Sequence, residues 1–483
     1  MKYKCFPVAL FSALLAVSGA AQIRPRVTAN ELKADVSFLA SDALQGRGTP
    51  SPGLEIAGEY IAAQFRRAGL EPAGDDGFFQ TAEYQSVTPN PEAADLTLEM
   101  GGKTYQADRA AMSVQQPVAA DLSRAPIIRI SLNDSAALNA MSPGSLRGKA
   151  LLVDIPDAGG AAFAGVRRIQ AAAGRLAPAI IIFSRSSGAG AGSRARLREA
   201  SAPASSVPIL VVWDAAIRGA LGASGDATVS VHIPAPAIQT VKLRNVVGVL
   251  RGSDPVLRDT YVVLSAHYDH LGVRGTGEGD RIFNGANDDA SGAASVIAAA
   301  GALSALKEKP KRSIVFITLF GEEVGALGSR HYCQHPVFPL AGTIADINLE
   351  QLGRTDDLEG PRLLQFNLTG FDYTNIASIF QKAGDESGIK VVKHEKNSDA
   401  FFAASDNASF AEAGIPSTTI SVSYIFPDYH KAGDEWPKLD YENMASVDMA
   451  ITLGLFRIAD SNDEPQWNAD NPRTARYIQA RKK

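Results

Sequence analysis

The sequence is poor in cysteine, in excess basic charge and in long apolar segments, and each shortage excludes a class of protein. Only two of the 483 residues are cysteine, Cys5 and Cys333, and Cys5 lies in a segment expected to be removed, so the mature chain has no internal disulfide. Lys and Arg number 47 against 52 Asp and Glu, which leaves no overall basic field for nucleic acid. No later segment has the roughly 20 apolar residues of a membrane span. Hydrophobic residues make up 45% and charged residues 20%, as in folded globular proteins.

The N-terminus has the pattern of an export signal. Lys2 and Lys4 precede a short apolar run over residues 6–17, and small residues follow at 18–21. A basic start, an apolar run and a small-residue cleavage site are the three parts of a secretory signal peptide. We therefore expect an exported chain, periplasmic or extracellular, without stable membrane insertion after cleavage.

Composition and periodicity divide the chain into five segments. The expected boundaries are 1–21 for the signal peptide, 22–116 for the N-terminal part of the main domain, 117–240 for an inserted smaller domain, 241–460 for the rest of the main domain, and 461–483 for a polar, loosely held tail. The insert is rich in Ala, Gly and Ser, with short apolar runs around one helical stretch. The first main-domain segment opens with two amphipathic helices, one after Thr28 and one over about 54–68.

Strand and helix signals alternate through the main domain. Buried strands are expected at 261–265, 313–320, 344–349 and 417–422, with an Ala-rich helix at 291–306. This alternation predicts an α/β fold with a mostly parallel central sheet flanked by helices.

Polar residues follow these strands where each one ends. They are His267 and Asp269 after the first strand, Asp288 before the Ala-rich helix, Glu322 and Glu323 after the second strand, Glu350 after the third, and His430 on a loop beyond the fourth. Ligands of open α/β sheets bind at the carboxyl ends of the strands, so we expect these side chains to converge.

Crowded carboxylates need a cation. At about 4 Å and an effective dielectric near 20, each like-charged pair costs roughly 4 kcal/mol. Two imidazoles and three carboxylates offer the nitrogen and oxygen donors that Zn²⁺ accepts. The charges of Asp288, Glu323 and Glu350 balance two Zn²⁺ with one hydroxide, whereas one Zn²⁺ would leave the cluster negative. Two zinc ions are therefore expected.

The region from about 241 to 455 resembles the co-catalytic di-zinc aminopeptidase family, which includes bacterial leucyl aminopeptidases, glutamate carboxypeptidase II, glutaminyl cyclases and the transferrin receptor ectodomain. The motifs that carry the resemblance are 267–272 (HYDHLG), 284–292, 321–323 (GEE), 347–350 (INLE), Ser405-Asp406 with 414–416, and Tyr429-His430. Residues 28–70 also look like the family's N-terminal portion, and the insert looks like a protease-associated domain.

The resemblance implies a ligand set. Asp288 would bridge the two metals, His267 and Glu350 would complete one site, and Glu323 and His430 would complete the other. The family more often has Asp at the position of Glu350. The side chain of Glu350 is one methylene longer, which could change the spacing of the metals and whether the second site is filled.

The resemblance also implies catalytic roles. Glu322 would be the general base, Tyr429 would donate to the oxyanion, and Asp269 would hold the ring of His267. Asn407 is a second departure, at a position where an aromatic residue or His is frequent. His270 is expected to pack in the loop after the first strand.

One further cluster has a structural interpretation. His331, Cys333 and His335 follow the Glu-Glu motif and are expected to cover a helix end rather than to bind metal.

The expected function is that of an exported zinc aminopeptidase acting on peptides with a free N-terminus. Three alternatives stay open: a glutaminyl cyclase-like enzyme, a carboxypeptidase for acidic dipeptides, and a receptor-like ectodomain without activity. Because all five ligand positions and Glu322 are present, the last alternative is disfavoured. The sequence makes no prediction of oligomeric state.

Overall fold

The computed structural model describes residues 25–132, 134–155, 160–186, 195–201, 207–221, 226–275 and 278–482. The predicted signal peptide, residues 1–21, lies outside the described residues. The chain divides into two compact units, one of residues 1–80 with 244–483 and one of residues 81–243. In the described residues, no helix is long and apolar enough to cross a membrane.

The first unit is built on a mostly parallel sheet, as predicted. Its strand order is β21-β20-β22-β17-β13-β16-β12. The strands are β12 (Ala237–Leu250), β13 (Tyr261–His267), β16 (Ser313–Leu319), β17 (Thr343–Leu349), β20 (Gln365–Leu368), β21 (Lys390–Val392) and β22 (Ser417–Ser421). The three pairings among β16, β13, β17 and β22 are parallel, and β12 and β20 pair antiparallel to their neighbours β16 and β22. The four expected strands are thus confirmed.

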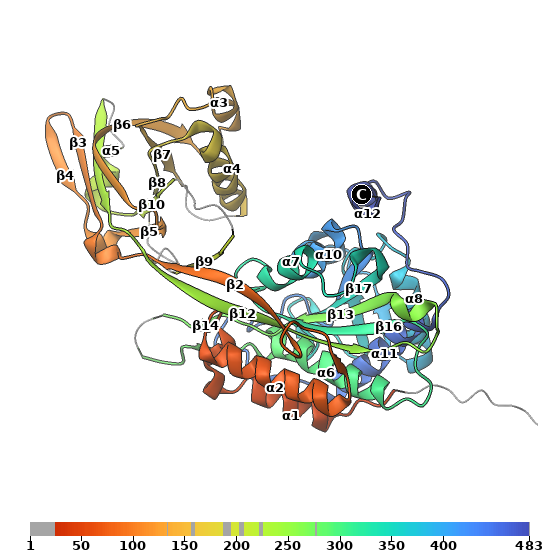
Figure 1. Ribbon diagram of the computed structural model, residues 1–483. Coiled ribbons are helices and arrows are strands. Elements are labelled where there is room, and N and C mark those ends of the chain that lie inside the picture. The colour runs from red at the N-terminus through yellow and green to blue at the C-terminus, as the bar shows by residue number, and fades with distance from the viewer. Residues whose placement is uncertain are drawn as a thin grey trace, which may run out of the picture. The chain divides into compact units, whose positions relative to one another are not determined.

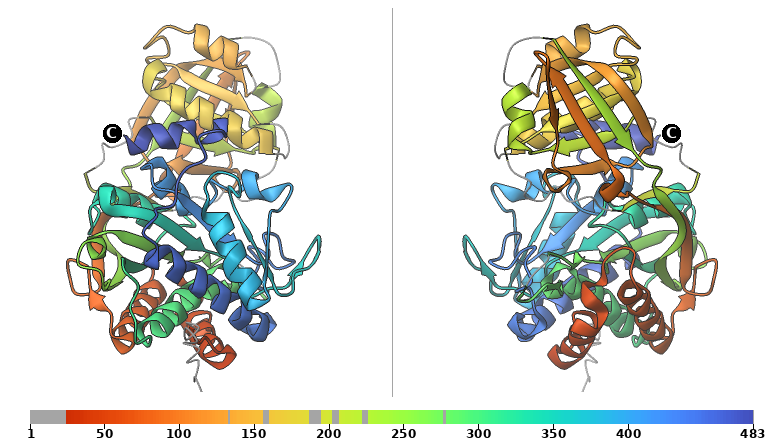
Figure 2. Two further views of the ribbon diagram at one scale, coloured as in Figure 1. Left: turned by 90° about the vertical axis from the view of Figure 1, so that its right-hand side faces the viewer. Right: turned by 90° about the vertical axis from the view of Figure 1, so that its left-hand side faces the viewer.

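Helices cover both faces of this sheet (Figure 1 and Figure 2). The helices are α1 (Ala29–Leu39), α2 (Pro52–Ala68), α6 (Ser291–Ser304), α7 (Leu327–Gln334), α8 (Ile376–Ser387), α9 (Asn397–Ala400), α10 (Asn407–Glu412), α11 (Tyr441–Asp460) and α12 (Ala475–Arg481). On one face α6 and α11 pack on the strands, with α1 and α2 outside α6, whereas α7 and α10 pack on the other face.

Local sequence explains where the main helices begin and end. Thr28 caps α1 by accepting the backbone N–H of Glu31 at 3.3 Å. Ser51 caps α2, Pro52 occupies its first turn, and Gly69 ends it with φ +76°. Helix α6 is rich in Ala and buried on nearly all sides, because it lies between the sheet and the outer helices.

The second unit has its own sheet and two apolar cores. The strand order is β4-β3-β11-β6-β7-β8-β10-β5, and the pairs β6–β7, β7–β8 and β8–β10 are parallel. The strands are β3 (Asp95–Met100), β4 (Lys103–Gln106), β5 (Met112–Gln116), β6 (Ala120–Ser131), β7 (Ala150–Asp154), β8 (Ile180–Ser184), β10 (Ile209–Val212) and β11 (Ala227–Ile233), and the helices are α3 (Ser135–Ala140), α4 (Gly160–Leu176) and α5 (Ala215–Leu221). One core lies around Leu152 and Leu210, and the other around Leu151 and Ile181.

The boundary of this unit differs from the sequence-based one. The insert was expected at 117–240, but the compact unit begins at Thr81, within β2 (Phe79–Thr88). Strands β3, β4 and β5 pair only inside this unit, so they belong to it and not to the N-terminal part of the main domain. Its assignment as a protease-associated-type domain stays a prediction.

The C-terminal segment is not loosely held. Trp467 stacks on Tyr477 of α12 with ring centroids 4.9 Å apart, and both pack with Phe402. The Trp467 indole N–H also donates to the carbonyl of Gly414 at 2.9 Å. These aromatic contacts, which the polar composition of 461–483 concealed, anchor the segment to the first unit.

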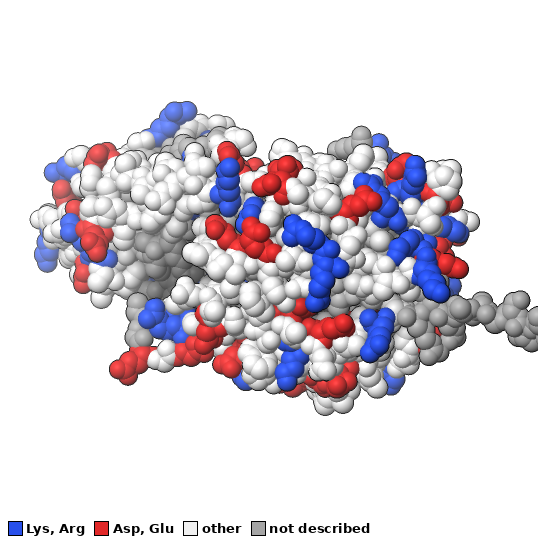
Figure 3. All heavy atoms as spheres, turned by 60° about the horizontal axis from the view of Figure 1, so that its bottom comes forward, with Lys and Arg blue, Asp and Glu red and all other residues white. Residues whose placement is uncertain are grey.

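Charged side chains of both signs are interspersed over the described surface that Figure 3 shows, in keeping with the nearly balanced composition.

Candidate metal centre

The site lies at the carboxyl edge of the first unit's parallel strands. His267 is the last residue of β13, Glu322 and Glu323 follow β16 after a short turn, and Glu350 comes directly after β17. Because these strands run parallel, their ends meet at one edge of the sheet.

Asp288 reaches this edge from an irregular segment before α6. Its φ and ψ (−113° and 91°) are not helical, and its peptide bond to Asp289 is cis. The carboxylate of Asp434 accepts the backbone N–H groups of Asn287 and Asp288, both at 3.0 Å. Asp434 thereby orients the segment, a role that no sequence pattern predicted.

The two oxygens of Asp288 face two different imidazoles. Oδ1 lies 3.3 Å from Nε2 of His267, and Oδ2 lies 3.1 Å from Nε2 of His430. Each imidazole has a second carboxylate beside it: Glu350 Oε1 is 3.8 Å from His267, and Glu323 Oε1 is 3.5 Å from His430. The five residues expected to bind metal therefore converge, with Asp288 between two imidazole–carboxylate pairs.

These spacings suit divalent cations. Zinc bonds to nitrogen and oxygen are about 2.0–2.2 Å, so the donors of a tetrahedral site are roughly 3.3–3.6 Å apart. The four donor separations, 3.1, 3.3, 3.5 and 3.8 Å, scatter around that range. His267 and Asp288 are buried, whereas His430 is 39% exposed and lies on the solvent side.

Burial and mutual charge move the pKa values of this cluster apart. Burial raises the pKa of Glu322 well above its usual range and that of Glu350 to about 7. Burial acts the same way on Asp288, but the imidazoles of His267 and His430 outweigh it and lower its pKa. Groups so strongly perturbed in one place are typical of functional sites.

Asp269 supports the first imidazole from behind. Its Oδ1 is 3.5 Å from Nδ1 of His267 and its backbone carbonyl is 3.1 Å from the same atom. The hydroxyl of Thr49 donates to its other oxygen at 2.9 Å. Asp269 is fully buried, so the ring of His267 is held with Nε2 toward Asp288.

Glu350 is also fixed by neighbours. The hydroxyl of Ser405 donates to Oε1 of Glu350, and the amide of Asn348 donates to Ser405 at 2.8 Å. This chain of hydrogen bonds sets the position of the longer side chain that stands where the resembled family more often has Asp.

Tyr429 and Asn407 have clear positions. The ring of Tyr429 stacks on that of His430, with centroids 4.0 Å apart, so its side chain borders the site. Asn407 is buried, donates to the carbonyl of Phe402 at 2.8 Å and accepts from Thr419 at 2.9 Å, which gives it a structural role.

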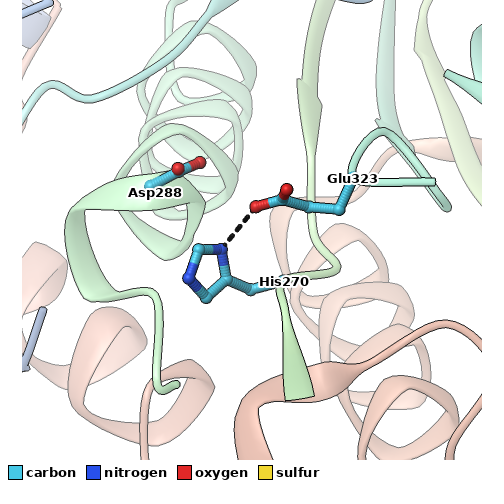
Figure 4. A group of neighbouring side chains, drawn as sticks. All are labelled: His270, Asp288 and Glu323. Atoms are coloured by element: carbon cyan, nitrogen blue, oxygen red, sulfur yellow. Dashed lines mark ion pairs between the residues drawn. The ribbon is translucent and has the colours of Figure 1, made fainter. Parts of the chain in front are cut away.

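His270 lies in the centre and not merely in the loop where it was expected to pack. Its Nδ1 is 2.7 Å from Oε1 of Glu323, and His270, Asp288 and Glu323 form a group with donor atoms within 4.8 Å of one another (Figure 4). The only sequence feature that pointed to a place for His270 in the site was its position three residues after His267.

Arg47 is a further residue that sequence reasoning missed. It is fully buried, and its guanidinium donates to the carbonyls of Tyr268, Asn284 and Gly285 at 2.7–2.9 Å. It thereby ties together the loops that carry His270 and Asp288. Nothing in its Gly-Arg-Gly context pointed to segments more than 200 positions away.

The His331–Cys333–His335 cluster lies at the end of α7, as expected. The two imidazole rings are 4.8 Å apart. Cys333 is half-buried, and burial raises the pKa of its thiol.

Comparisons with known proteins agree with this architecture. Residues 245–453 match the model of peptidase family M28. Among curated proteins, the chain is 27% identical over 222 residues to a vacuolar membrane protease of Candida dubliniensis (44% of this chain, 21% of that protein) and 22% identical over 229 residues to aminopeptidase YwaD of Bacillus subtilis (46% of each). The matches thus span less than half the length of these relatives.

Solved structures extend the likeness in fold to nearly the whole chain. An aminopeptidase from Aneurinibacillus sp. strain AM-1 has a TM-score of 0.60 at 21% sequence identity, and the alignment covers 93% of this chain and 98% of that chain. BSAP, a zinc aminopeptidase from Bacillus subtilis, has a TM-score of 0.55 at 18% identity and covers 91% and 96%. The matched residues 245–453 build the sheet edge that carries the site, and this part of the chain is similar to peptidase family M28.

Proposed function

We propose that the chain is an exported zinc aminopeptidase that hydrolyses the first peptide bond of peptides with a free N-terminus. The observation that carries the proposal is the Asp288 carboxylate, whose two oxygens each face an imidazole with a carboxylate beside it. The family of residues 245–453 and the zinc aminopeptidase with a similar fold support the same chemistry.

In this proposal Asp288, His267 and Glu350 would hold one zinc ion, and Asp288, Glu323 and His430 would hold the other. Zinc bound there would supply a Lewis acid for the scissile carbonyl and would lower the pKa of water from about 15.7 toward roughly 7.

Glu322 is the general base. Its carboxylate is buried beside the cluster, and burial raises its pKa, as suits a group that accepts a proton from water and returns it to the leaving amine near neutral pH. The backbone N–H of Glu322 donates a hydrogen bond to Oδ1 of Asp269 at 3.1 Å, which limits the movement of Glu322. Such acid–base help contributes roughly 10²–10⁴-fold to the rate.

Tyr429 donates to the developing oxyanion. Burial raises the pKa of its hydroxyl, and the surrounding carboxylates raise it further, so the group keeps its proton at neutral pH. A hydroxyl donor placed where negative charge develops stabilises the transition state.

The excess of carboxylates favours a substrate with a free amine. Beyond the proposed metal ligands, Glu322 is half-buried and Asp289 is fully buried at this edge, and burial and the repulsion of neighbouring carboxylates raise the pKa of each. A terminal ammonium at this edge would relieve that repulsion, which an acetylated N-terminus cannot do.

The test is a paired substrate panel. Aminoacyl-anilides and dipeptides with free and with acetylated N-termini are assayed with the purified chain, with chelator, and with zinc restored, and bound metal is counted. We expect cleavage of the free-amine substrates only, its loss with chelator and its return with zinc. Equal cleavage of acetylated substrates, pyroglutamate formation from N-terminal Gln, or activity untouched by chelation would each overturn the assignment.

Export has a separate test. We expect mass spectrometry of the protein from producing cells to find a mature N-terminus near Gln22 in the periplasm or medium. An intact N-terminus retained in the cytoplasm would contradict it.

A further inference from the structure

We propose that His270 is a third imidazole ligand of the proposed metal centre, bound at the position formed by Asp288 and Glu323. The inference rests on the proposed metal binding and adds a ligand to it.

The first support is convergence. Nδ1 of His270 lies 2.7 Å from Oε1 of Glu323. Taking one donor atom from each of His270, Asp288 and Glu323, all three atoms lie within 4.8 Å of one another. Figure 4 shows the imidazole and the two carboxylates turned toward a common space from three separate segments. The ring of His430, which also contacts Asp288 and Glu323, is edge-on to that of His270 at 5.8 Å.

The second support is the lack of hydrogen-bond partners. The side chain of His270 is fully buried, yet among the described residues neither of its ring nitrogens makes a hydrogen bond, and neither does Oε1 of Glu323. Buried polar atoms without partners are rare and indicate a missing ion or water. A cation bound by Nδ1 and Oε1 together would satisfy both.

The third support is a backbone shaped to hold the ring. Gly285 has φ +59°, and a Cβ there would lie 2.3 Å from Cγ of His270. The backbone N–H of His270 donates to the carbonyl of Arg47 at 3.2 Å, and the Arg47 guanidinium donates to the carbonyl of Gly285 at 2.9 Å. The imidazole is thus fixed between two loops that one buried arginine joins.

The extra ligand makes the two metal positions unequal. One would have four protein donors, Asp288, Glu323, His270 and His430. The other would have three, His267, Asp288 and Glu350, and three protein ligands are typical of a zinc site that keeps a place for water or substrate.

The competing role for His270 is a positioning one, in which Nδ1–H donates to Glu323 without touching the metal. The 2.7 Å separation would allow a charge-assisted hydrogen bond. A direct count of metal-bound imidazoles separates the two roles.

The experiment uses the full chain loaded with cadmium-113. Proton–cadmium correlation spectra detect ring protons of each histidine bound to the metal. We expect three imidazole signals, with His270→Ala losing one of them and the exposed control His232→Ala keeping all three. Two signals in the unaltered protein would overturn the role of His270 and leave the proposed function standing, whereas no bound cadmium would overturn both.

Metal affinity gives a second measurement if His270→Ala does not fold. With His270→Asn we expect one of the two zinc ions to bind more than 100-fold more weakly while the other is retained. A loss of roughly 10–100-fold, the usual effect of a residue behind a ligand, would overturn direct ligation.

Discussion

Asp269 joins the two halves of the site, because the oxygen that lies 3.5 Å from Nδ1 of His267 also accepts the backbone N–H of Glu322 at 3.1 Å. One buried carboxylate thus orients an imidazole at the end of β13 and the proposed base after β16. The relative position of the His267 ring and the proposed base therefore depends on this side chain.

Asp269→Asn should therefore lower both metal affinity and turnover. The amide can still accept from Glu322, but it loses the negative charge that supports the His267 ring, and such partners contribute roughly 10–100-fold to metal affinity. Zinc titration and kcat measurements check this. Thr49→Val, which removes only the hydroxyl bonded to the far oxygen of Asp269, should have a smaller effect on both quantities.

Glu322→Gln should separate chemistry from metal binding. The amide keeps the shape of the side chain but cannot take a proton, so kcat should fall by roughly 10²–10⁴-fold. Bound zinc, counted in the same sample, should stay unchanged, because the proposed ligands are untouched. Near-normal turnover would show that another group accepts the proton.

The sequence could predict the parts of the site that follow regular elements. His267, Glu322, Glu323 and Glu350 come directly after buried parallel strands, so strand periodicity alone placed them at one edge. The alternation of strands and helices likewise gave the sheet of the first unit.

It could not predict contacts that irregular segments make across the chain. Arg47 and Asp434 act through backbone groups of loops far away in sequence, and the ring of His270 lies where only a glycine at 285 leaves room for it. No periodic pattern encodes such contacts. The same holds for Trp467, whose stacking on Tyr477 turns a polar segment into a packed one.

Glu350→Asp should weaken the metal centre although it restores the residue that the resembled family more often has. The shorter side chain would lose the hydrogen bond from Ser405 that now fixes Oε1 of Glu350. We expect a lower affinity for one zinc ion and lower kcat. Ser405→Ala should change affinity in the same direction by a smaller factor, and unchanged zinc binding in both variants would show that neither the length of the side chain at 350 nor its bond from Ser405 sets the zinc affinity.

Gly285→Ala should disturb the site through the backbone alone. An alanine there is strained at φ +59°, and its Cβ would lie 2.3 Å from both the carbonyl of Asp288 and the ring of His270. We expect a lower melting temperature and weaker zinc binding. Gly388→Ala, at φ +74° in open space at the end of α8, is the matched control: it carries the backbone strain without the contacts and should leave zinc affinity unchanged.

Asp448→Asn should make the stability of the protein less dependent on pH. Asp448 is buried on α11, accepts a hydrogen bond from Ser295 at 2.8 Å, and has its pKa raised to about 7 by burial. The folded state binds this proton more tightly than the unfolded state. The wild type should therefore lose up to roughly 4 kcal/mol of stability from this group as pH rises from about 4 to about 7, and the contribution should stay constant above pH 7. The difference in unfolding free energy between wild type and variant, measured by denaturant at pH 5 and pH 8, isolates this contribution.

Relative to wild type, the Asp448→Asn variant should be more stable at pH 8 than it is at pH 5. The control Glu442→Gln, on the exposed start of the same helix, should show the same difference from wild type at both pH values. A difference that stays constant between the two pH values would mean that Asp448 is not protonated in the folded protein.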